Sequence, residues 1–156
     1  MEGRDYYGEI AAVKEVWGVD FMLIRVATEA DFQVIQTYDH HISQKELSHS
    51  IQRNRVYLAE EQEKFLGWLR YNLFWDNTPF MNMLFFLEEN RGKGYGRQLV
   101  EYWENEMKEQ GYEVVMTSTA SDEYAQHFYH KLGYVTIGGF TLQDDPYEVI
   151  LSKQIR

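Results

Sequence analysis

The segment ENRGKGYGRQLVEYW, residues 89–103, places three glycines on alternate positions directly before a pattern of helical period. The glycines are Gly92, Gly94 and Gly96, and the apolar positions that follow them are Leu99, Val100, Trp103 and Met107. Glycine loses more conformational freedom on folding than any other residue, so such a cluster needs a physical reason. An anion site is one reason, because the first N–H groups of a helix lack intrahelical acceptors and the helix dipole is positive there.

Three basic residues, Arg91, Lys93 and Arg97, lie among these glycines. Their charge favours a phosphate site over a turn that only lets a strand and a helix pack closely. A Walker loop is excluded, because Lys93 is followed by Gly94 and Tyr95 rather than by Ser or Thr. A dinucleotide fingerprint is excluded as well, because Arg97 takes the place of its third glycine. The segment therefore predicts a phosphate-bearing ligand and leaves its identity open.

Composition and charge narrow the class of protein. A chain of 156 residues with 44% hydrophobic and 16% aromatic residues predicts one folded domain rather than a disordered chain. It has no cysteine, so disulfides and thiolate metal sites are excluded, and we expect a cytoplasmic protein. The formal net charge of -10 argues against non-specific binding of nucleic acid. No apolar run approaches the length of a membrane span, and the N-terminus lacks the pattern of a signal peptide.

The remaining patterns predict strands and helices in a definite order. Strands are expected at residues 21–27, 56–60, 65–75, 80–87, 112–119, 134–140 and 147–153, and helices at residues 9–17, 28–38, 43–53, 97–111 and 121–132. The strand at 80–87 is nearly all apolar, so we expect it to be buried on both faces. Hairpins in the first half and strand–helix–strand units in the second predict one mixed sheet covered by helices.

Two segments together resemble one known family. The loop pattern R-x-x-G-x-G at residues 91–96 resembles the acyl-CoA pyrophosphate loop of the GNAT superfamily of N-acetyltransferases. LFFLEENRGKGYGRQLV, residues 84–100, resembles the family's core strand, loop and helix, and AQHFYHKLGY, residues 125–134, resembles its second conserved segment. The resemblance implies a single GNAT domain at residues 22–156 with an α/β (α+β mixed) fold. Its central sheet would be mixed, mostly antiparallel and twisted, with six to seven strands and about four flanking helices.

The resemblance leaves residues 1–21 unexplained. Met22 stands where many single domains begin, so two interpretations stay open for this N-terminal extension. It is either a functional arm or the product of an upstream start.

The resemblance also implies an activity. The chain would transfer an acetyl group from acetyl-CoA, its co-substrate, to a primary amine of a small-molecule or peptide acceptor. Direct attack by the amine is expected, because there is no cysteine to form a covalent intermediate. The alternative is a non-catalytic acyl-CoA-binding or sensing domain on the same fold. The acceptor, the general base and the oligomeric state, including a homodimer, stay open, and no metal, nucleic acid or membrane partner is expected.

Site residues follow from matching this chain to the family's motifs. The expected cofactor-binding residues are Leu84, Phe85, Phe86, Arg91, Gly92, Lys93, Gly94, Tyr95, Gly96, Arg97 and Asp122. Asp122 stands where the family often has an asparagine, and the simpler expectation for it is that it caps the last helix. Tyr129 matches the family's general acid, which would donate a proton to the thiolate leaving group.

The acceptor pocket is expected between the first two helices of the domain and the hairpin at residues 70–80. Tyr71, Trp75 and Asn82 are its expected substrate contacts, with aromatic walls that would suit a cationic amine. Because the strand at 80–87 contains no acid, deprotonation of the amine through an ordered water is expected. The five histidines are expected to be exposed rather than metal-binding.

Overall fold

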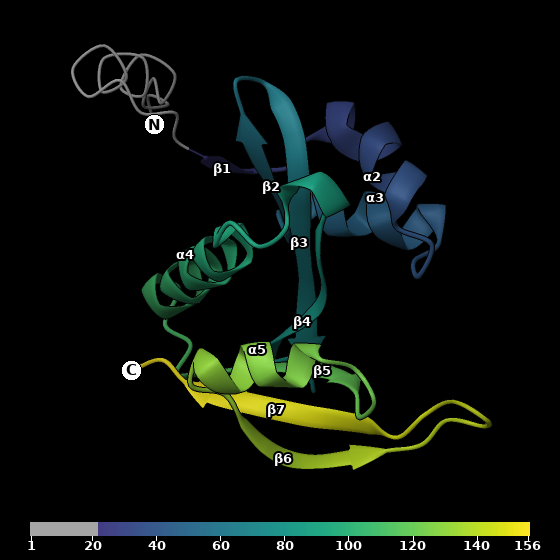
Figure 1. Cartoon of the computed structure of the whole chain (residues 1–156). Coiled ribbons are helices and arrows are strands. Elements are labelled where there is room, and N and C mark those ends of the chain that lie inside the picture. Colours follow the sequence, from purple (N-terminus) through teal and green to yellow (C-terminus); the bar gives the residue numbers. More distant parts are fainter. Residues whose placement is uncertain (1–21) are drawn as a thin grey trace.

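Seven strands form one sheet, in the order β1-β2-β3-β4-β5-β7-β6, in the computed structural model, which describes residues 22–156 (Figure 1). The strands are β1 Leu23–Val26, β2 Val56–Glu61, β3 Lys64–Phe74, β4 Thr78–Phe86, β5 Val114–Ala120, β6 Val135–Phe140 and β7 Glu148–Gln154. The helices of this part are α2 Phe32–Tyr38, α3 Gln44–Gln52, α4 Tyr95–Glu109 and α5 Ala125–Lys131, with 3-10 turns η1 Glu29–Asp31 and η2 Glu88–Asn90. The predicted mixed, mostly antiparallel fold is confirmed, and the helix predicted at 9–17 lies outside the described residues.

One pair of neighbouring strands, β4 and β5, is parallel, and α4 connects them. The other neighbours pair antiparallel. The pairing of β4 with β5 covers only Phe80 with Met116 and Met81 with Thr117. Beyond these positions the two strands separate, and β5, β7 and β6 cross the direction of β3 and β4 (Figure 1).

A β-bulge lies on β4 where this separation begins. Arg70 of β3 pairs with Met83, whereas Tyr71 pairs with Met81, so Asn82 is an extra residue without a partner in β3. A bulge bends its strand and increases the local twist. The prediction that this strand is buried on both faces was wrong, because Asn82 is exposed and Leu84 and Phe85 are only half-buried where β5 turns away.

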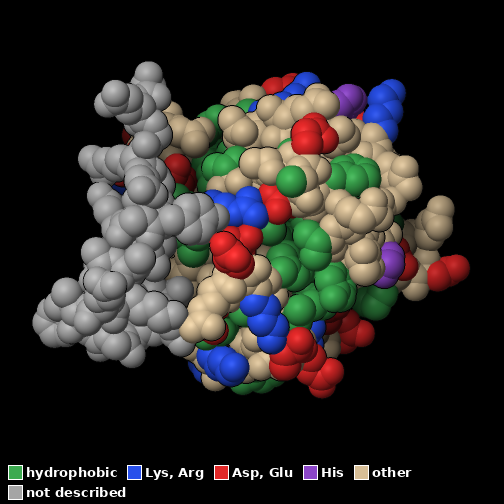
Figure 2. Space-filling model, turned by 90° about the horizontal axis from the view of Figure 1, so that it is seen from above, with side chains coloured by type: hydrophobic (Ala, Val, Ile, Leu, Met, Phe, Trp, Pro, Cys, Tyr) green, Lys and Arg blue, Asp and Glu red, His purple; other side chains and the backbone are tan. Residues whose placement is uncertain are grey.

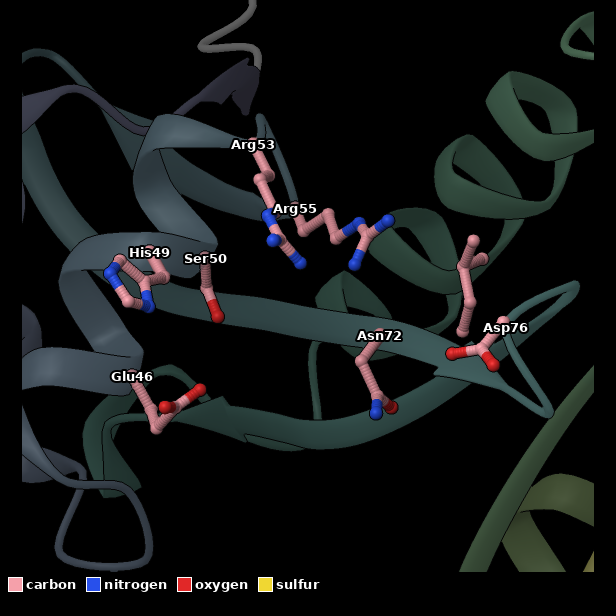
Figure 3. Close-up of a pocket in the computed structure, with 8 residues that line it drawn as sticks. Glu46, His49, Ser50, Arg53, Arg55, Asn72 and Asp76 are labelled. Carbon is pink, nitrogen blue, oxygen red and sulfur yellow. The ribbon is translucent and has the colours of Figure 1, made fainter.

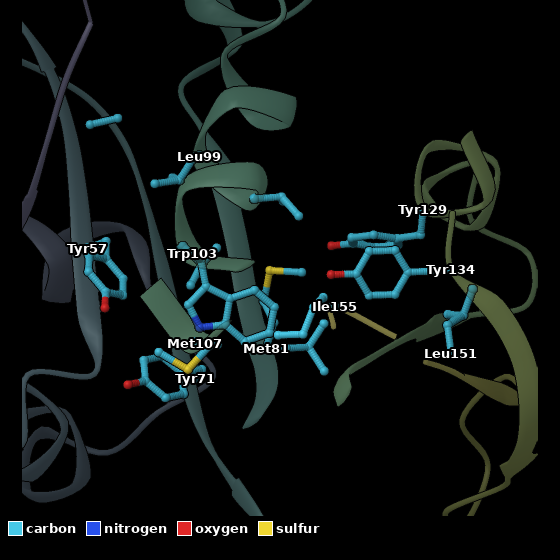
Figure 4. Packing of buried hydrophobic residues seen from close by; sticks show 14 of the residues in the cluster. Tyr57, Tyr71, Met81, Leu99, Trp103, Met107, Tyr129, Tyr134, Leu151 and Ile155 are labelled. Atoms are coloured by element: carbon cyan, nitrogen blue, oxygen red, sulfur yellow. The ribbon is translucent and has the colours of Figure 1, made fainter. Parts of the chain in front are cut away.

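Helices cover both faces of the sheet. On one face, α4 and α5 bury the larger apolar cluster, in which Trp103 packs among Tyr57, Tyr71 and Met81 (Figure 4). On the other face, α2 and α3 bury a smaller cluster around Trp68. Fully burying a side chain of this size contributes roughly 1.5–3 kcal/mol, so both helix pairs are fixed mainly by packing.

Local signals in the sequence set the helix ends. At the start of α3 the Ser43 hydroxyl accepts a hydrogen bond from the Glu46 N–H at 3.2 Å, which caps the helix. Gly111 has φ +93° directly after α4, where a left-handed residue lets the last carbonyls of the helix be satisfied. Asp122 does not cap the last helix, which was a wrong prediction. The chain forms a turn at residues 121–124 first, and the N-cap of α5 is Tyr124.

A buried ion pair ties α2 to β3. Arg70 donates from Nε to Asp39 Oδ2 at 2.8 Å and from Nη2 to Oδ1 at 3.3 Å, and both side chains are buried. Trp68 Nε1 donates to the same carboxylate at 3.4 Å. These contacts hold the end of α2, and the segment after it, against the middle of β3.

We predict that Asp39→Asn lowers the free energy of unfolding by about 3 kcal/mol, because it leaves the buried Arg70 charge without a counterion. Urea unfolding followed by tryptophan fluorescence measures the change. Glu113→Gln is the matched control, because it breaks the exposed 3.6 Å pair with Arg156 and is expected to change stability by at most about 1 kcal/mol. Equal effects of the two substitutions would contradict the role given to the buried pair.

Candidate active site

Residues 91–97, called the glycine segment below, cover the end of the connection from β4 to α4 and the first turn of that helix. Gly92 and Gly94 have φ of +73° and +81°, in the left-handed region that favours glycine. A Cβ atom added to either residue would meet no atom within 4 Å, so backbone conformation rather than crowding calls for glycine there. Gly94 is the N-cap of α4, and its carbonyl accepts the hydrogen bond of Gln98 N–H at 3.2 Å.

The segment leaves backbone donors available. Among the described residues, the N–H groups of Gly92, Gly94 and Gly96 donate to no backbone carbonyl. They lie at the N-terminus of a 15-residue helix, whose dipole is positive at this end. A negatively charged group would be stabilised in front of this helix.

The three basic side chains of the glycine segment have different environments. Arg91 donates from Nε to the Phe86 carbonyl at 2.8 Å, and its guanidinium lies 5.0 Å from the centre of the Phe85 ring, so it anchors the segment to the end of β4. Arg97 forms an exposed ion pair with Glu101 at 2.8 Å. Lys93 is exposed and has no ion pair within residues 22–156.

On the face shown in Figure 2, Lys and Arg side chains lie beside Asp and Glu side chains, and neither sign forms a continuous patch. An anion that binds to this negatively charged chain must therefore be held by a local arrangement of groups.

A cavity of about 630 Å³ lies where β4 and β5 separate. One wall is β4, from Met81 to Phe85, and the other is the carboxyl end of β5, from Thr117 to Ala120. In the described chain no strand pairs with the β5-facing edge of β4 beyond Met81. Its backbone groups are available to an extended ligand that hydrogen-bonds as an added strand would.

Tyr129 of α5 lines this cavity and is only 6% exposed. Burial raises the pKa of its phenol to about 12, a hydrogen bond with Thr117 partly lowers it, and the Glu123 carboxylate raises it further. The phenol is therefore protonated throughout the physiological range and can donate a hydrogen bond to a group in the cavity.

The helix that carries Tyr129 also borders the glycine segment. Gly96 lies in the first turn of α4, and a Cβ atom there would be 3.5 Å from the ring of Phe128, the residue before Tyr129. The N-terminus of α4 therefore lies against α5, the helix that carries the buried phenol of Tyr129 into the cavity between β4 and β5.

The three residues expected to contact the acceptor do not lie together in the structure. Asn82 lines the cavity, as do the cofactor residues Leu84 and Phe85. Tyr71 instead lies in the apolar core, 5% exposed and stacked on Tyr57. Trp75 lies at the tip of the β3–β4 hairpin, 79% exposed, with its ring against Phe74. Neither Tyr71 nor Trp75 is among the residues that line the cavity.

Of the eleven expected cofactor residues, only Leu84 and Phe85 line the cavity, and residues 91–97, Phe86 and Asp122 lie outside its wall. Phe86 is buried in the core, and its carbonyl accepts the hydrogen bond from Arg91. Asp122 is exposed in the turn before α5 and does not line the cavity.

Several ionisable cavity residues were not found from the sequence. They are His41 from the α2–α3 connection, Glu123 before α5, and Asp145 and Glu148 around the β6–β7 connection. Thr119 and Glu123 are linked by a 3.0 Å hydrogen bond. A usable signal existed for β5, because ligands bind at the carboxyl ends of parallel strands, and Thr117 and Thr119 lie at such an end. His41 and Asp145 carry no comparable local signal.

The histidines and the described helices add two observations. All five histidines are exposed, as predicted. Within residues 22–156 no three His, Asp or Glu side chains are grouped as a metal site would require. In the same part of the chain, no helix has the length and apolar character needed to cross a membrane.

Comparison with solved structures identifies the fold. Ard1 from Thermoplasma volcanium matches with a TM-score of 0.75 and 15% identity, covering 85% of this chain and 97% of that one. The ribosomal-protein-S18-alanine N-acetyltransferase of Escherichia coli matches with a TM-score of 0.71 and 16% identity, covering 86% and 94%. The yncA protein of Salmonella typhimurium, solved with its cofactor acetyl-CoA, matches with a TM-score of 0.68 and 19% identity, covering 86% and 94%.

Sequence comparison identifies the family. Among curated proteins, none matches the chain at a significant level. The family model described as "Acetyltransferase (GNAT) family" matches residues 22–134, which is most of the chain and includes β4, the glycine segment, α4 and α5. The chain therefore belongs to the GNAT family of acetyltransferases and is an acyltransferase.

Proposed function

We propose that this acyltransferase moves an acetyl group from acetyl-CoA to a primary amine by direct nucleophilic attack. The observation that carries the proposal is the buried phenol of Tyr129 in the cavity between the diverging strands β4 and β5. An acid is then present beside an unpaired strand edge that can hold an extended thioester. The structure of yncA with acetyl-CoA supports acetyl-CoA as the donor.

The donor would bind along β4 and end at α4. The amide groups of the pantetheine arm would pair with the free edge of β4 at Leu84 and Phe85, as an added strand does. The pyrophosphate would accept hydrogen bonds from the N–H groups of Gly92 to Arg97. Lys93, Arg97 and Lys131 are exposed bases that could meet the 3′-phosphate.

In the reaction, the amine nitrogen forms a bond to the thioester carbon and the C–S bond breaks. The leaving thiolate needs a proton or a strong hydrogen bond, and Tyr129 would supply it. Because burial raises the pKa of this phenol to about 12, the residue acts as a protonated donor at neutral pH. Since the chain has no cysteine, attack on the thioester without an acyl-cysteine intermediate is favoured.

The acceptor amine must lose a proton, since an alkyl ammonium group has a pKa of about 10. The ionisable groups that line the cavity besides Tyr129 are His41, Glu123, Asp145 and Glu148. A water held by one of them would accept the proton. The acidic groups would also attract the ammonium form of the acceptor.

Replacing Tyr129 with Phe is expected to lower kcat by about 10²–10⁴-fold, because the acid is lost while the ring remains. Binding of acetyl-CoA, measured by calorimetry, should change by less than about twofold, since the phenol acts mainly on the leaving group. Tyr124→Phe is the matched control, because Tyr124 is 77% exposed in the same segment. Unchanged turnover in Tyr129→Phe would remove Tyr129 from the mechanism.

The pH profile of kcat gives a second test. The folded-state pKa of Tyr129 is raised, so its acid form persists until the pH approaches about 12. We therefore expect kcat to rise with pH as the amine deprotonates and to show no fall up to about pH 10. A falling limb between about pH 8 and 10 that disappears in Tyr129→Phe would contradict the raised pKa.

Gly94→Ala tests the glycine segment. The left-handed conformation at φ +81° costs an alanine about 1–2 kcal/mol, so the donors of the segment should lose their arrangement. We expect the Kd of acetyl-CoA to rise by about tenfold. Gly138→Ala is the matched control, since a Cβ atom there also meets nothing within 4 Å but φ is not positive. Equal Kd values for the two variants would contradict the role of the segment in donor binding.

A further inference from the structure

A second cavity, of about 510 Å³, lies beside α3 and is separate from the one that holds Tyr129 (Figure 3). Its wall includes His49 and Ser50 of α3, and its floor includes Asn72 of β3. It exists because β2 begins at Val56, opposite Arg70, while β3 continues to Phe74. Past this point the β2-side edge of β3 has no partner strand in the described chain.

Two arginines reach into this cavity from a rigid turn. α3 ends at Gln52, Asn54 follows it with φ 57°, and the N–H groups of Asn54 and Arg55 donate to Ile51 and Ser50 carbonyls at 3.0 and 2.9 Å. The Arg55 carbonyl in turn accepts the Tyr71 N–H of β3 at 3.1 Å. Figure 3 shows the side chains of Arg53 and Arg55 extending from this turn over β3.

Neither guanidinium has an ion pair or a side-chain hydrogen bond within residues 22–156. Of the other described arginines, Arg25, Arg70, Arg97 and Arg156 have carboxylate partners, and Arg91 donates to the Phe86 carbonyl. The negative end of the α3 dipole stabilises a charge at Arg53, but it leaves the guanidinium donors unused.

The acids of the cavity do not neutralise the two arginines. Glu46 and Asp76 lie at opposite ends of the group of side chains in Figure 3, and neither is within ion-pair distance of Arg53 or Arg55. The guanidinium fork matches the planar oxygens of a carboxylate and those of a phosphate. An oxyanion between the two arginines would gain charge-assisted hydrogen bonds, and the nearby Ser50 hydroxyl could add another.

The second cavity adjoins the active site through one hydrogen bond. Asn82 lines the cavity of Tyr129, Asn72 lines the second cavity, and Asn82 Nδ2 donates to Asn72 Oδ1 at 2.7 Å. Both side chains are exposed. A ligand could therefore occupy both cavities by passing over this asparagine pair.

We propose that Arg53 and Arg55 bind an oxyanion, a carboxylate or a phosphate, that the acceptor carries at the end away from its reactive amine. This proposal rests on the proposed acetyl transfer. The acceptor class is then an amine with an anionic group, whose amine reaches the carboxylate-lined cavity while its anion stays on the arginines.

The test compares matched acceptors. Initial rates of CoA release are measured with ω-amino carboxylic acids of increasing chain length, with aminoalkyl phosphates, and with the carboxamide of each amino acid as the neutral counterpart. In the wild type we expect kcat/KM to be at least about tenfold higher for an anionic acceptor than for its carboxamide. The advantage should depend on chain length and fall at high salt. Comparison of the carboxylates with the phosphates shows which oxyanion is preferred.

Substitution of the two arginines distinguishes an effect on acceptor binding from an effect on the chemical step. In the Arg53→Gln/Arg55→Gln variant, KM for the anionic acceptors should rise by about tenfold with little change in kcat, because binding common to ground and transition states is lost. Rates with the carboxamides should stay within about twofold. Arg156→Gln is the control, since it removes an exposed arginine away from both cavities.

The possible outcomes distinguish a failure of the proposed function from a failure of this inference. No CoA release with any amine would overturn the proposed function. Transfer that is equally fast to anionic and neutral acceptors, and insensitive to the arginine substitutions, would overturn this inference and leave the proposed function intact. Independently of turnover, titration with inorganic phosphate or glutarate should shift the backbone amide signals of Arg53, Arg55 and Asn72 and not that of Arg156. Unshifted signals would also overturn the inference.

Discussion

β4 and β5 stay paired over only two residue pairs, and the architecture of the site depends on their separation beyond Met81 and Thr117. The bulge at Asn82 bends β4 at this point, while β5 continues its pairing with β7 along its full length. A continuous parallel pair would leave no cavity and no unpaired backbone on β4. The separation produces both, so the proposed donor binding and the proposed chemistry depend on one structural feature.

The groups that surround this opening come from distant parts of the chain. The glycine segment fixes the N-terminus of α4 at one end of β4, and α5 brings Tyr129 to the opening. The α2–α3 connection and the β6–β7 connection add His41 and Asp145. Charge is thereby divided locally, with backbone donors and bases near α4 and carboxylates at the cavity of Tyr129. This division of charge would let a chain with a net charge of -10 bind the proposed anionic donor beside an acceptor that carries an ammonium group.

Polar contacts hold the loops around the site against the strands of the sheet. The Arg70–Asp39 pair holds the segment that contains His41 against β3, and Arg91 fastens the glycine segment to the end of β4. The Schellman turn after α3 places Arg53 and Arg55 beside the uncovered end of β3. The first two contacts join a loop to a strand, and the Arg55 carbonyl joins the turn after α3 to Tyr71 of β3, so the sheet helps to position all three loops.

The sequence by itself determined the fold class and the family, and it predicted that residues 91–97 bind a phosphate. The fold class follows from hydrophobic period, the phosphate prediction follows from glycine spacing and charge, and the family follows from the resemblance of residues 84–100 and 125–134 to its conserved segments. All of these signals lie within short segments, so they can be read without knowing which strands pair. The same local view failed for Asp122 and for the burial of β4, because a turn before α5 and the loss of pairing with β5 are set by neighbours in space. Only the tertiary structure decided that Tyr71 belongs to the core, that four ionisable groups from three connections meet at one cavity, and that Arg53 and Arg55 have no ion-pair partner within residues 22–156. The physical reason is that side-chain environment depends on residues far away in the chain, and no spacing within one segment records them.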